Sequence, residues 1–121
     1  MAHDTPPAPG SYGSSTARQA LAKDVATAMG LARFTPTGPA SNAVVDRLRA
    51  HIRGALPEAT AQLATLPNTR GRDIVAHTLD GARNLLKRSC PDPAARLTLH
   101  AKYAELVLSI AEEWRAKKPT G

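Results

Sequence analysis

The stretch AARLTLHAKYAELVLSIAEEWRAK, residues 94–117, decides the fold, because its apolar residues recur with the period of an α-helix on more than one face. The main stripe consists of Leu97, Ala101, Ala104, Val107 or Leu108, Ala111 and Trp114. A second row consists of Leu99, Tyr103, Leu106 and Ile110. A helix that is apolar on more than one face must be covered on more than one side. Two arrangements satisfy this requirement: other helices of the chain surround it, or its outer row joins a second copy in a homodimer.

The preceding segment, residues 72–89, predicts a second helix. Its apolar side consists of Val75, Leu79, Ala82 and Leu86. Gly81 lies inside this helix, where glycine costs about 1 kcal/mol relative to alanine, so we expect it to permit close contact with a neighbouring helix. The turn that follows contains Asp92 and Pro93, which we expect to be the N-cap and the first residue of the last helix.

A longer periodic segment begins after Ser41, a good N-cap residue, and runs to Leu66. Its apolar residues are Val45, Leu48, Ile52, Ala55, Ala59, Leu63 and Leu66. The pattern keeps its phase across Pro57, which predicts one helix kinked at the proline rather than two helices. Residues 17–29 predict a shorter helix that Thr16 caps and Gly30 ends.

The fold class that follows is all-α. Aromatic residues make up only 3% of the 121 residues, so the core must use Ala, Leu, Val and Ile, and this composition works against a sheet. We expect a disordered tail over 1–15, an N-terminal helix and Pro/Gly linker over 16–40, and a helical bundle over 41–118. Short turns make the three long helices antiparallel neighbours. Whether the N-terminal helix packs on them is left open.

Composition excludes several classes of protein. The first residues do not form a secretory signal, and no apolar run is long enough for a membrane span, so we expect a cytoplasmic location. Cys90 is the only cysteine, which excludes an internal disulfide and a cysteine-based zinc site. The net charge of +6 favours anionic partners, although many small proteins carry such a charge for solubility alone.

Three histidines, His51, His77 and His100, are distributed one to each long helix. Aligning the helices through their turns places His51 and His77 about 15 Å apart along the bundle axis, too far to share one ion. We therefore predict no metal and no cofactor. An alternative hypothesis places His51, His100 and Tyr103 around a ligand pocket beside Arg49 or Arg53.

Basic residues gather at one end of the predicted bundle. They are Arg47, Arg49, Arg53, Arg83, Lys87, Arg88 and Arg96. Arginines gathered in this way can bind carboxylate or phosphate through forked hydrogen bonds, which predicts a small anionic ligand or an acidic partner. The competing interpretation is an ordinary solvated surface. Nucleic acid is disfavoured, because the long helices do not form a helix-turn-helix and the chain lacks stacking aromatic residues.

Two stretches carry a family resemblance. Leu48, Arg49, His51, Ile52, Pro57 and Glu58 match an L-R-x-H-I…P-E helix, and Ala82, Arg83 and Leu86 approximate an A-R-x-x-L element. Together with the final helix, they make residues 42–115 resemble small helical actinobacterial proteins called "natural product biosynthesis protein". Where that family more often has a His-Tyr pair near the end, this chain has Ala-Glu-Glu-Trp. The resemblance implies a role near specialised metabolism and supplies no catalytic residues.

The expected function is that of a non-enzymatic accessory or regulatory protein that is itself a homodimer and acts through a partner protein. The alternative is a bundle that binds a small ligand or catalyses a reaction in natural product biosynthesis.

Overall fold

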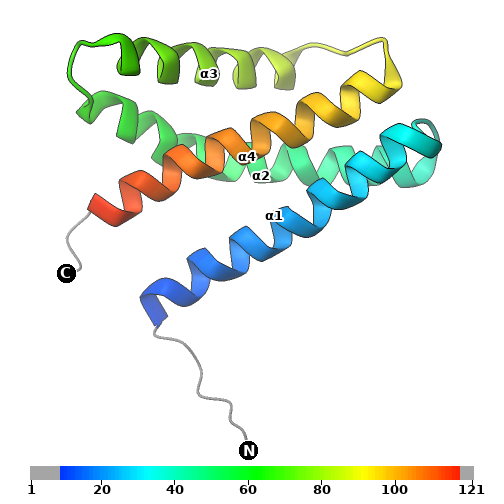
Figure 1. Cartoon of the computed structure of the whole chain (residues 1–121), viewed down its shortest axis with the longest axis horizontal. Coiled ribbons are helices and arrows are strands. Elements are labelled where there is room, and N and C mark those ends of the chain that lie inside the picture. Colours follow the sequence, from blue (N-terminus) through cyan, green and yellow to red (C-terminus); the bar gives the residue numbers. More distant parts are fainter. Residues whose placement is uncertain (1–8, 118–121) are drawn as a thin grey trace, which may run out of the picture.

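The computed structural model describes residues 9–117 and confirms the all-α prediction (Figure 1). Its helices are α1 (Pro9–Phe34), α2 (Pro39–Thr65), α3 (Arg70–Lys87) and α4 (Pro93–Lys117). The described residues contain no strand. None of the helices in this part of the chain is long and apolar enough to cross a membrane.

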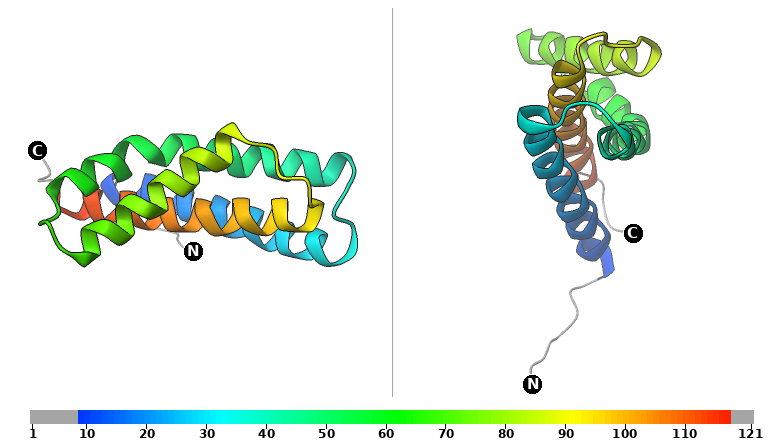
Figure 2. Two further views of the ribbon diagram at one scale, coloured as in Figure 1. Left: turned by 90° about the horizontal axis from the view of Figure 1, so that it is seen from above. Right: turned by 90° about the vertical axis from the view of Figure 1, so that its right-hand side faces the viewer.

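Helix α4 lies at the centre of the bundle, in contact with each of the other three helices. Its most extensive contact is with α2, and α1 packs on both of these helices. Figures 1 and 2 show α3 on one side of the α2–α4 pair and α1 on the other. The wide apolar arc of α4 is therefore covered mainly by helices of its own chain.

Small side chains allow α2 and α4 to approach closely. Their fully or almost fully buried residues are Val44, Val45, Leu48, Ile52, Ala55 and Ala59 in α2, and Leu97, Ala101, Ala104, Val107, Leu108, Ile110 and Ala111 in α4. Such a filled core of alanine and branched aliphatic residues depends on close packing, because each methyl group makes many weak contacts. The space between the helices is occupied by side chains.

The N-terminal helix packs on the bundle and contributes to its core. Leu21, Asp24 and Ala28 of α1 are buried, and α1 packs on both α2 and α4 more extensively than α3 does, whereas α3 buries only Leu79 and Ala82. At 26 residues, α1 is also longer than the 18-residue α3. Of the three helices predicted to form the core, α3 therefore contributes the fewest buried residues.

The boundaries of α1 differ from the prediction. The helix begins at Pro9, so the tail expected over 1–15 overlaps it from residue 9 onward, and residues 1–8 lie outside the described residues. Thr16 lies inside the helix rather than at its N-cap, and Gly30 is also internal, because the helix continues to Phe34. A glycine ends a helix only if the chain adopts a left-handed conformation there, and the backbone at Gly30 stays helical.

The start of α2 is set by Gly38, not by Ser41. Gly38 has a φ of 109°, a left-handed conformation that favours glycine, and Pro39 follows as the first helical residue. Ser41 is completely buried in the first turn, where its hydroxyl donates to the carbonyl of Thr35 at 2.8 Å. The expected N-cap therefore joins the end of α1 to the start of α2. Further along, α2 runs through Pro57 without interruption, as the constant phase of its apolar residues predicted.

Gly81 provides the close contact expected of it. A Cβ atom at this position would lie 2.4 Å from the Tyr103 hydroxyl oxygen and 2.8 Å from Cζ of the same ring. The Tyr103 ring of α4 therefore packs directly on the backbone of α3. A side chain as small as a methyl group at position 81 would force this ring to move.

We predict that the effect of Gly81→Ala depends on Tyr103. In a Tyr103→Leu background, the alanine should raise the free energy of unfolding by about 1 kcal/mol, because it improves helix propensity without a steric cost. With Tyr103 present, displacement of the ring should cancel or reverse that gain. Denaturant unfolding of the four proteins in this double-mutant cycle measures the difference. An equal effect of Gly81→Ala in both backgrounds would contradict the packing described here.

Candidate anion-binding site

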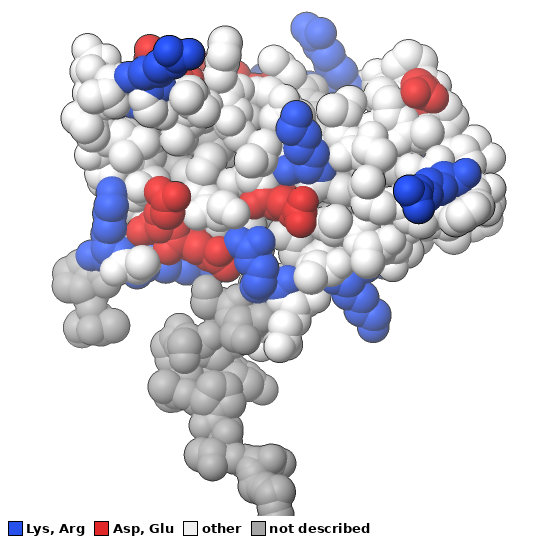
Figure 3. All heavy atoms as spheres, viewed as in Figure 1, with Lys and Arg blue, Asp and Glu red and all other residues white. Residues whose placement is uncertain are grey.

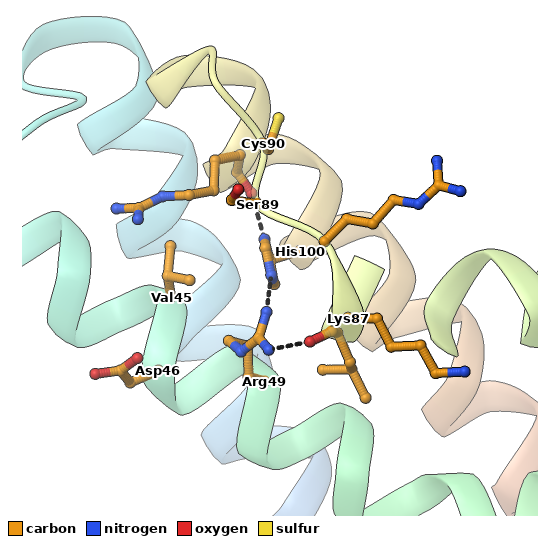
Figure 4. Close-up of a pocket in the computed structure, with 10 residues that line it drawn as sticks. Val45, Asp46, Arg49, Lys87, Ser89, Cys90 and His100 are labelled. Atoms are coloured by element: carbon orange, nitrogen blue, oxygen red, sulfur yellow. Dashed lines mark hydrogen bonds between the residues drawn. The ribbon is translucent and has the colours of Figure 1, made fainter. Parts of the chain in front are cut away.

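The structure brings some of the predicted basic residues together and separates others. Arg49, Lys87, Arg88 and Arg96 line one pocket of about 440 Å³ at the junction of α2, the end of α3 and the start of α4 (Figure 4). We call this the basic pocket. Asp46 is the one carboxylate in its lining. The other lining residues are Val45, Leu86, Ser89, Cys90 and His100.

The remaining predicted cations lie outside the basic pocket. Arg47 pairs with Asp24 at 2.9 Å. Arg83 is bound to the Thr60 hydroxyl at 2.8 Å and lies 3.5 Å from the Asp80 carboxylate. Arg53 is exposed and forms no ion pair with any described residue. Of the seven basic residues that were predicted to form one cluster, four therefore line the basic pocket and three lie outside it.

The wall of the basic pocket is held by Arg49. Its Nη1 donates to the Leu85 carbonyl at 3.3 Å, and its Nη2 donates to the Leu86 carbonyl. Both carbonyls belong to the last turn of α3, where backbone acceptors have no partner within the helix and the helix dipole favours a positive charge. Arg49 of α2 thus caps the C-terminus of α3.

The cap is reciprocal, because Arg72 at the start of α3 caps the C-terminus of α2. Its Nη1 donates to the carbonyls of Leu63 and Leu66 at 3.3 and 3.0 Å. At the C-terminus of each of these two antiparallel helices, two carbonyls are therefore bonded to an arginine of the other helix. This exchange fixes the register of α2 and α3 at both ends of the hairpin.

Arg49 also determines which ring nitrogen of His100 carries the proton. The His100 side chain is 2% exposed. Arg49 Nη1 lies 3.2 Å from His100 Nε2, and His100 Nδ1 lies 2.7 Å from the Arg96 carbonyl (Figure 4). A guanidinium can only donate, so Nε2 must accept, and the proton of the neutral ring is on Nδ1, which donates to the carbonyl. Both ring nitrogens are therefore engaged.

Burial lowers the pKa of His100, and the positive charges of Arg49 and Arg96 lower it further, although the hydrogen bond to the Arg96 carbonyl acts in the opposite direction. The imidazole is consequently neutral at pH 7.

Two cations at the rim of the pocket, Lys87 and Arg88, differ from Arg49 because their charged groups are not bonded to the protein and can contact a ligand. Lys87 and Arg88 are exposed and form no ion pair with any carboxylate of the described residues. Figure 4 shows Lys87 directed away from Arg49 and His100. Arg96 donates from Nη2 to Asn42 Oδ1 at 2.6 Å, while its enclosed Nε has no acceptor.

Two arginines in another part of the bundle are paired with carboxylates across helices. Arg18 of α1 bonds to Glu112 of α4, and Arg115 of α4 bonds to Glu58 of α2, with Nε–O distances of 3.2 and 2.7 Å. In Figure 3, which shows the molecule from the direction of Figure 1, acidic and basic side chains lie next to one another at the lower left. The basic pocket differs, because its cations outnumber its carboxylates and are not paired with them.

The alternative pocket of His51, His100 and Tyr103 is not formed, because the three residues lie in different places. His51 contacts α1, where its Nε2 lies 2.9 Å from Asp24 Oδ2. Tyr103 lines a separate groove between α3 and α4 together with His77. The described residues contain no group of three or more His, Cys, Asp or Glu residues that could hold a metal ion.

Asp24 is a polar residue of the core that sequence reasoning missed. It is 8% exposed and accepts hydrogen bonds from both Arg47 and His51. Burial alone would raise the pKa of its carboxyl group, but the hydrogen bonds from His51 and Arg47 outweigh burial and lower it. The signal was present in the sequence, since Asp24 lies three residues after Leu21 and four before Ala28, on the apolar face.

We predict that acidification destabilises the fold through His100. Because the pKa is lowered in the folded state, the unfolded chain binds the proton first, and stability falls as the pH drops below about 6.5, the ordinary histidine pKa. The loss should approach about 1.4 kcal/mol per pH unit until the folded-state pKa is reached. Unfolding measured between pH 7 and 5 tests this, with His100→Gln expected to flatten the dependence and the exposed His77→Gln expected to preserve it. An unchanged slope in His100→Gln would refute this role.

We also predict that Arg49→Met lowers the free energy of unfolding by about 2–3 kcal/mol, because it leaves two partly buried carbonyls of α3 and Nε2 of the buried His100 without a donor. The matched control is Arg53→Met in the same helix, which removes an exposed charge and should change stability by less than about 0.5 kcal/mol. Thermal or denaturant unfolding compares the two. Equal effects would show that Arg49 is not a structural cap.

Comparison with protein-family models, curated proteins and solved structures finds no match for this chain. The resemblance of residues 42–115 therefore remains an expectation from the sequence, and the geometry of the basic pocket carries the functional argument.

Proposed function

We propose that this protein is a non-enzymatic accessory or regulatory protein that binds an acidic segment of a partner protein at the basic pocket. Its association with bacterial specialised metabolism is part of the proposal and rests on the resemblance of residues 42–115. The observation that carries the binding proposal is the uncompensated positive charge of Arg49, Lys87, Arg88 and Arg96, with Asp46 as the only carboxylate of the lining.

The arrangement of these cations supports binding. Arg49 and Arg96 are held by hydrogen bonds to the protein, whereas Lys87 and Arg88 are exposed side chains that can reach a ligand. Positive groups without carboxylate partners attract an acidic chain without first having to break an internal ion pair. Two bonded arginines with two exposed cations beside them suit an extended segment that carries several carboxylates.

Binding is favoured over catalysis by the state of His100. A general acid or base must have a nitrogen within hydrogen-bond reach of the substrate. His100 is buried, and its two nitrogens already have Arg49 and the Arg96 carbonyl as partners. The side chain best suited to proton transfer therefore has a structural role.

A homodimer receives less support than a partner of a different kind. The outer row of α4, which suggested a second copy, is largely covered within the chain, since Ile110 is 9% exposed and Tyr103 packs on α3. Leu106 remains 38% exposed. The charge of the basic pocket also disfavours pairing with an identical pocket, because like charges repel.

The test uses a Glu-rich peptide and a Lys-rich peptide of the same length, added to the ¹⁵N-labelled full chain and followed by NMR. We expect the Glu-rich peptide alone to shift amides of residues 45–49 and 86–100. The double variant Lys87→Glu/Arg88→Glu should bind it about tenfold more weakly, because two favourable exposed charge interactions become repulsive.

The matched control is Lys23→Glu/Arg53→Glu, which makes the same change in net charge at exposed positions outside the basic pocket. It should bind the Glu-rich peptide nearly as well as the unmodified chain. Equal weakening in the two double variants, or no shifts in the basic pocket, would overturn the proposal.

A further inference from the structure

Ser89 is the one residue with a hydroxyl group in the lining of the basic pocket. It follows Lys87 and Arg88 in the sequence and belongs to the connection between α3, which ends at Lys87, and α4, which begins at Pro93. Figure 4 shows Ser89 on this connection, next to Cys90. A group attached to the Ser89 hydroxyl would therefore lie in or beside the basic pocket.

The Ser89 hydroxyl is accessible and is not used by the fold. The residue is exposed and lies outside the helices, and its Oγ makes no hydrogen bond with any described residue. The two other serines whose side chains the structure describes are bonded. Ser41 donates to the Thr35 carbonyl, and Ser109 accepts from Arg18. Ser89 is therefore the described serine that an enzyme can modify without breaking a hydrogen bond of the bundle.

The charges around Ser89 favour an attached phosphate. The basic pocket has four cations and one carboxylate in its lining, and a phosphate monoester brings a charge of about −1.5 to −2 at pH 7 with three acceptor oxygens. The end of α3 acts in the opposite direction, since a helix C-terminus carries about half a negative charge. Arg49 already binds the carbonyls of that end, so the attraction of the remaining cations is the larger effect.

We propose that Ser89 is a phosphorylation site and that its phosphate binds the cations of the basic pocket. The reaction transfers a phosphoryl group from a nucleoside triphosphate, catalysed by a protein kinase. A bond forms between Ser89 Oγ and the γ-phosphorus, and the bond from that phosphorus to the oxygen bridging the β-phosphate breaks. The hydroxyl proton passes to a base of the kinase, and the nucleoside diphosphate leaves. Lys87 and Arg88, which are exposed and have no carboxylate partner among the described residues, are the nearest cations in the sequence.

The phosphate regulates the binding of the partner, and this part of the inference rests on the proposed function. Because Ser89 is part of the pocket, its phosphate competes with the acidic segment as an intramolecular ligand. A tethered group of this kind acts at an effective concentration on the order of mM. Phosphorylation of Ser89 therefore turns off a pocket that is open to an acidic partner when the hydroxyl is free.

The first measurement asks whether a kinase reaches Ser89 in the folded chain. The full chain is incubated with ATP and a protein kinase that prefers basic residues before its serine, and the modified position is mapped by mass spectrometry. We expect a phosphate on Ser89 and no phosphate at this position in Ser89→Ala. No incorporation, or incorporation at other hydroxyls alone, would overturn the inference.

The second measurement is a ³¹P NMR pH titration of the chain phosphorylated at Ser89. The second pKa of phosphoserine is ordinarily about 6, and cations bonded to the dianion lower it. We expect a pKa that is lower by about 0.5 and that returns toward about 6 in Lys87→Gln/Arg88→Gln. The matched control, Lys23→Gln/Arg53→Gln, removes two exposed charges outside the basic pocket and should keep the lowered pKa. An ordinary pKa, or equal pKa values in the two double variants, shows that the phosphate does not bind the pocket.

Titration with the Glu-rich peptide separates this inference from the proposed function. We expect the chain phosphorylated at Ser89 to bind the peptide at least about tenfold more weakly than the unmodified chain, and Ser89→Ala to bind it like the unmodified chain. Equal binding by the phosphorylated and unmodified chains refutes the regulation and leaves the proposed function standing. A lowered phosphoserine pKa, with no peptide binding by the unmodified chain, supports the phosphate site and counts against the proposed function alone.

Discussion

The Arg49 guanidinium is the interaction on which the functional end of the molecule depends. It links three helices, since it extends from α2, satisfies the last carbonyls of α3 and donates to the imidazole of α4. Without it, two carbonyls at the C-terminus of α3 and Nε2 of the buried His100 would lack a partner in the same small volume. The path of the chain from α3 into α4, and with it the wall of the basic pocket, follows from this contact. Arg72 secures the opposite end of the same hairpin.

Much of the fold could be predicted from the sequence because helical periodicity is a local signal. The all-α class, the continuity of α2 through Pro57 and the start of α4 at Pro93 are confirmed. The ends of α1 were wrong, because glycine and threonine are only preferences at helix ends and tertiary contacts decide whether they act there. Whether α1 belongs to the core could not be decided from the sequence. Turn lengths suggest which helices are neighbours in sequence, but they do not say that α1 returns to cover α4.

The candidate site was predicted in part. Counting residues through the turns brought Arg49, Lys87, Arg88 and Arg96 to one end of the bundle, where the structure places them around one pocket. Counting residues could not show which arginines would bond to other groups of the protein itself. Arg47 is bound by Asp24 of α1, and the packing of that helix was left open by the sequence. Nor could spacing show that Arg49 faces the carbonyls of α3, because that depends on the rotation of α2 about its axis.

The small share of buried side chains in α3 has a consequence for motion. The helix is attached through two fully buried apolar residues, three partly buried ones (Val75, Leu85 and Leu86), the ring of Tyr103 on Gly81, and arginine contacts. Detaching it exposes far less apolar surface than separating α2 from α4, so the free energy of that opening is a fraction of the free energy of global unfolding. We expect the amides of α3 to exchange with solvent deuterium before those of α4. The segment that ends at Lys87 and Arg88 would then be the part of the bundle most readily reshaped around a bound partner.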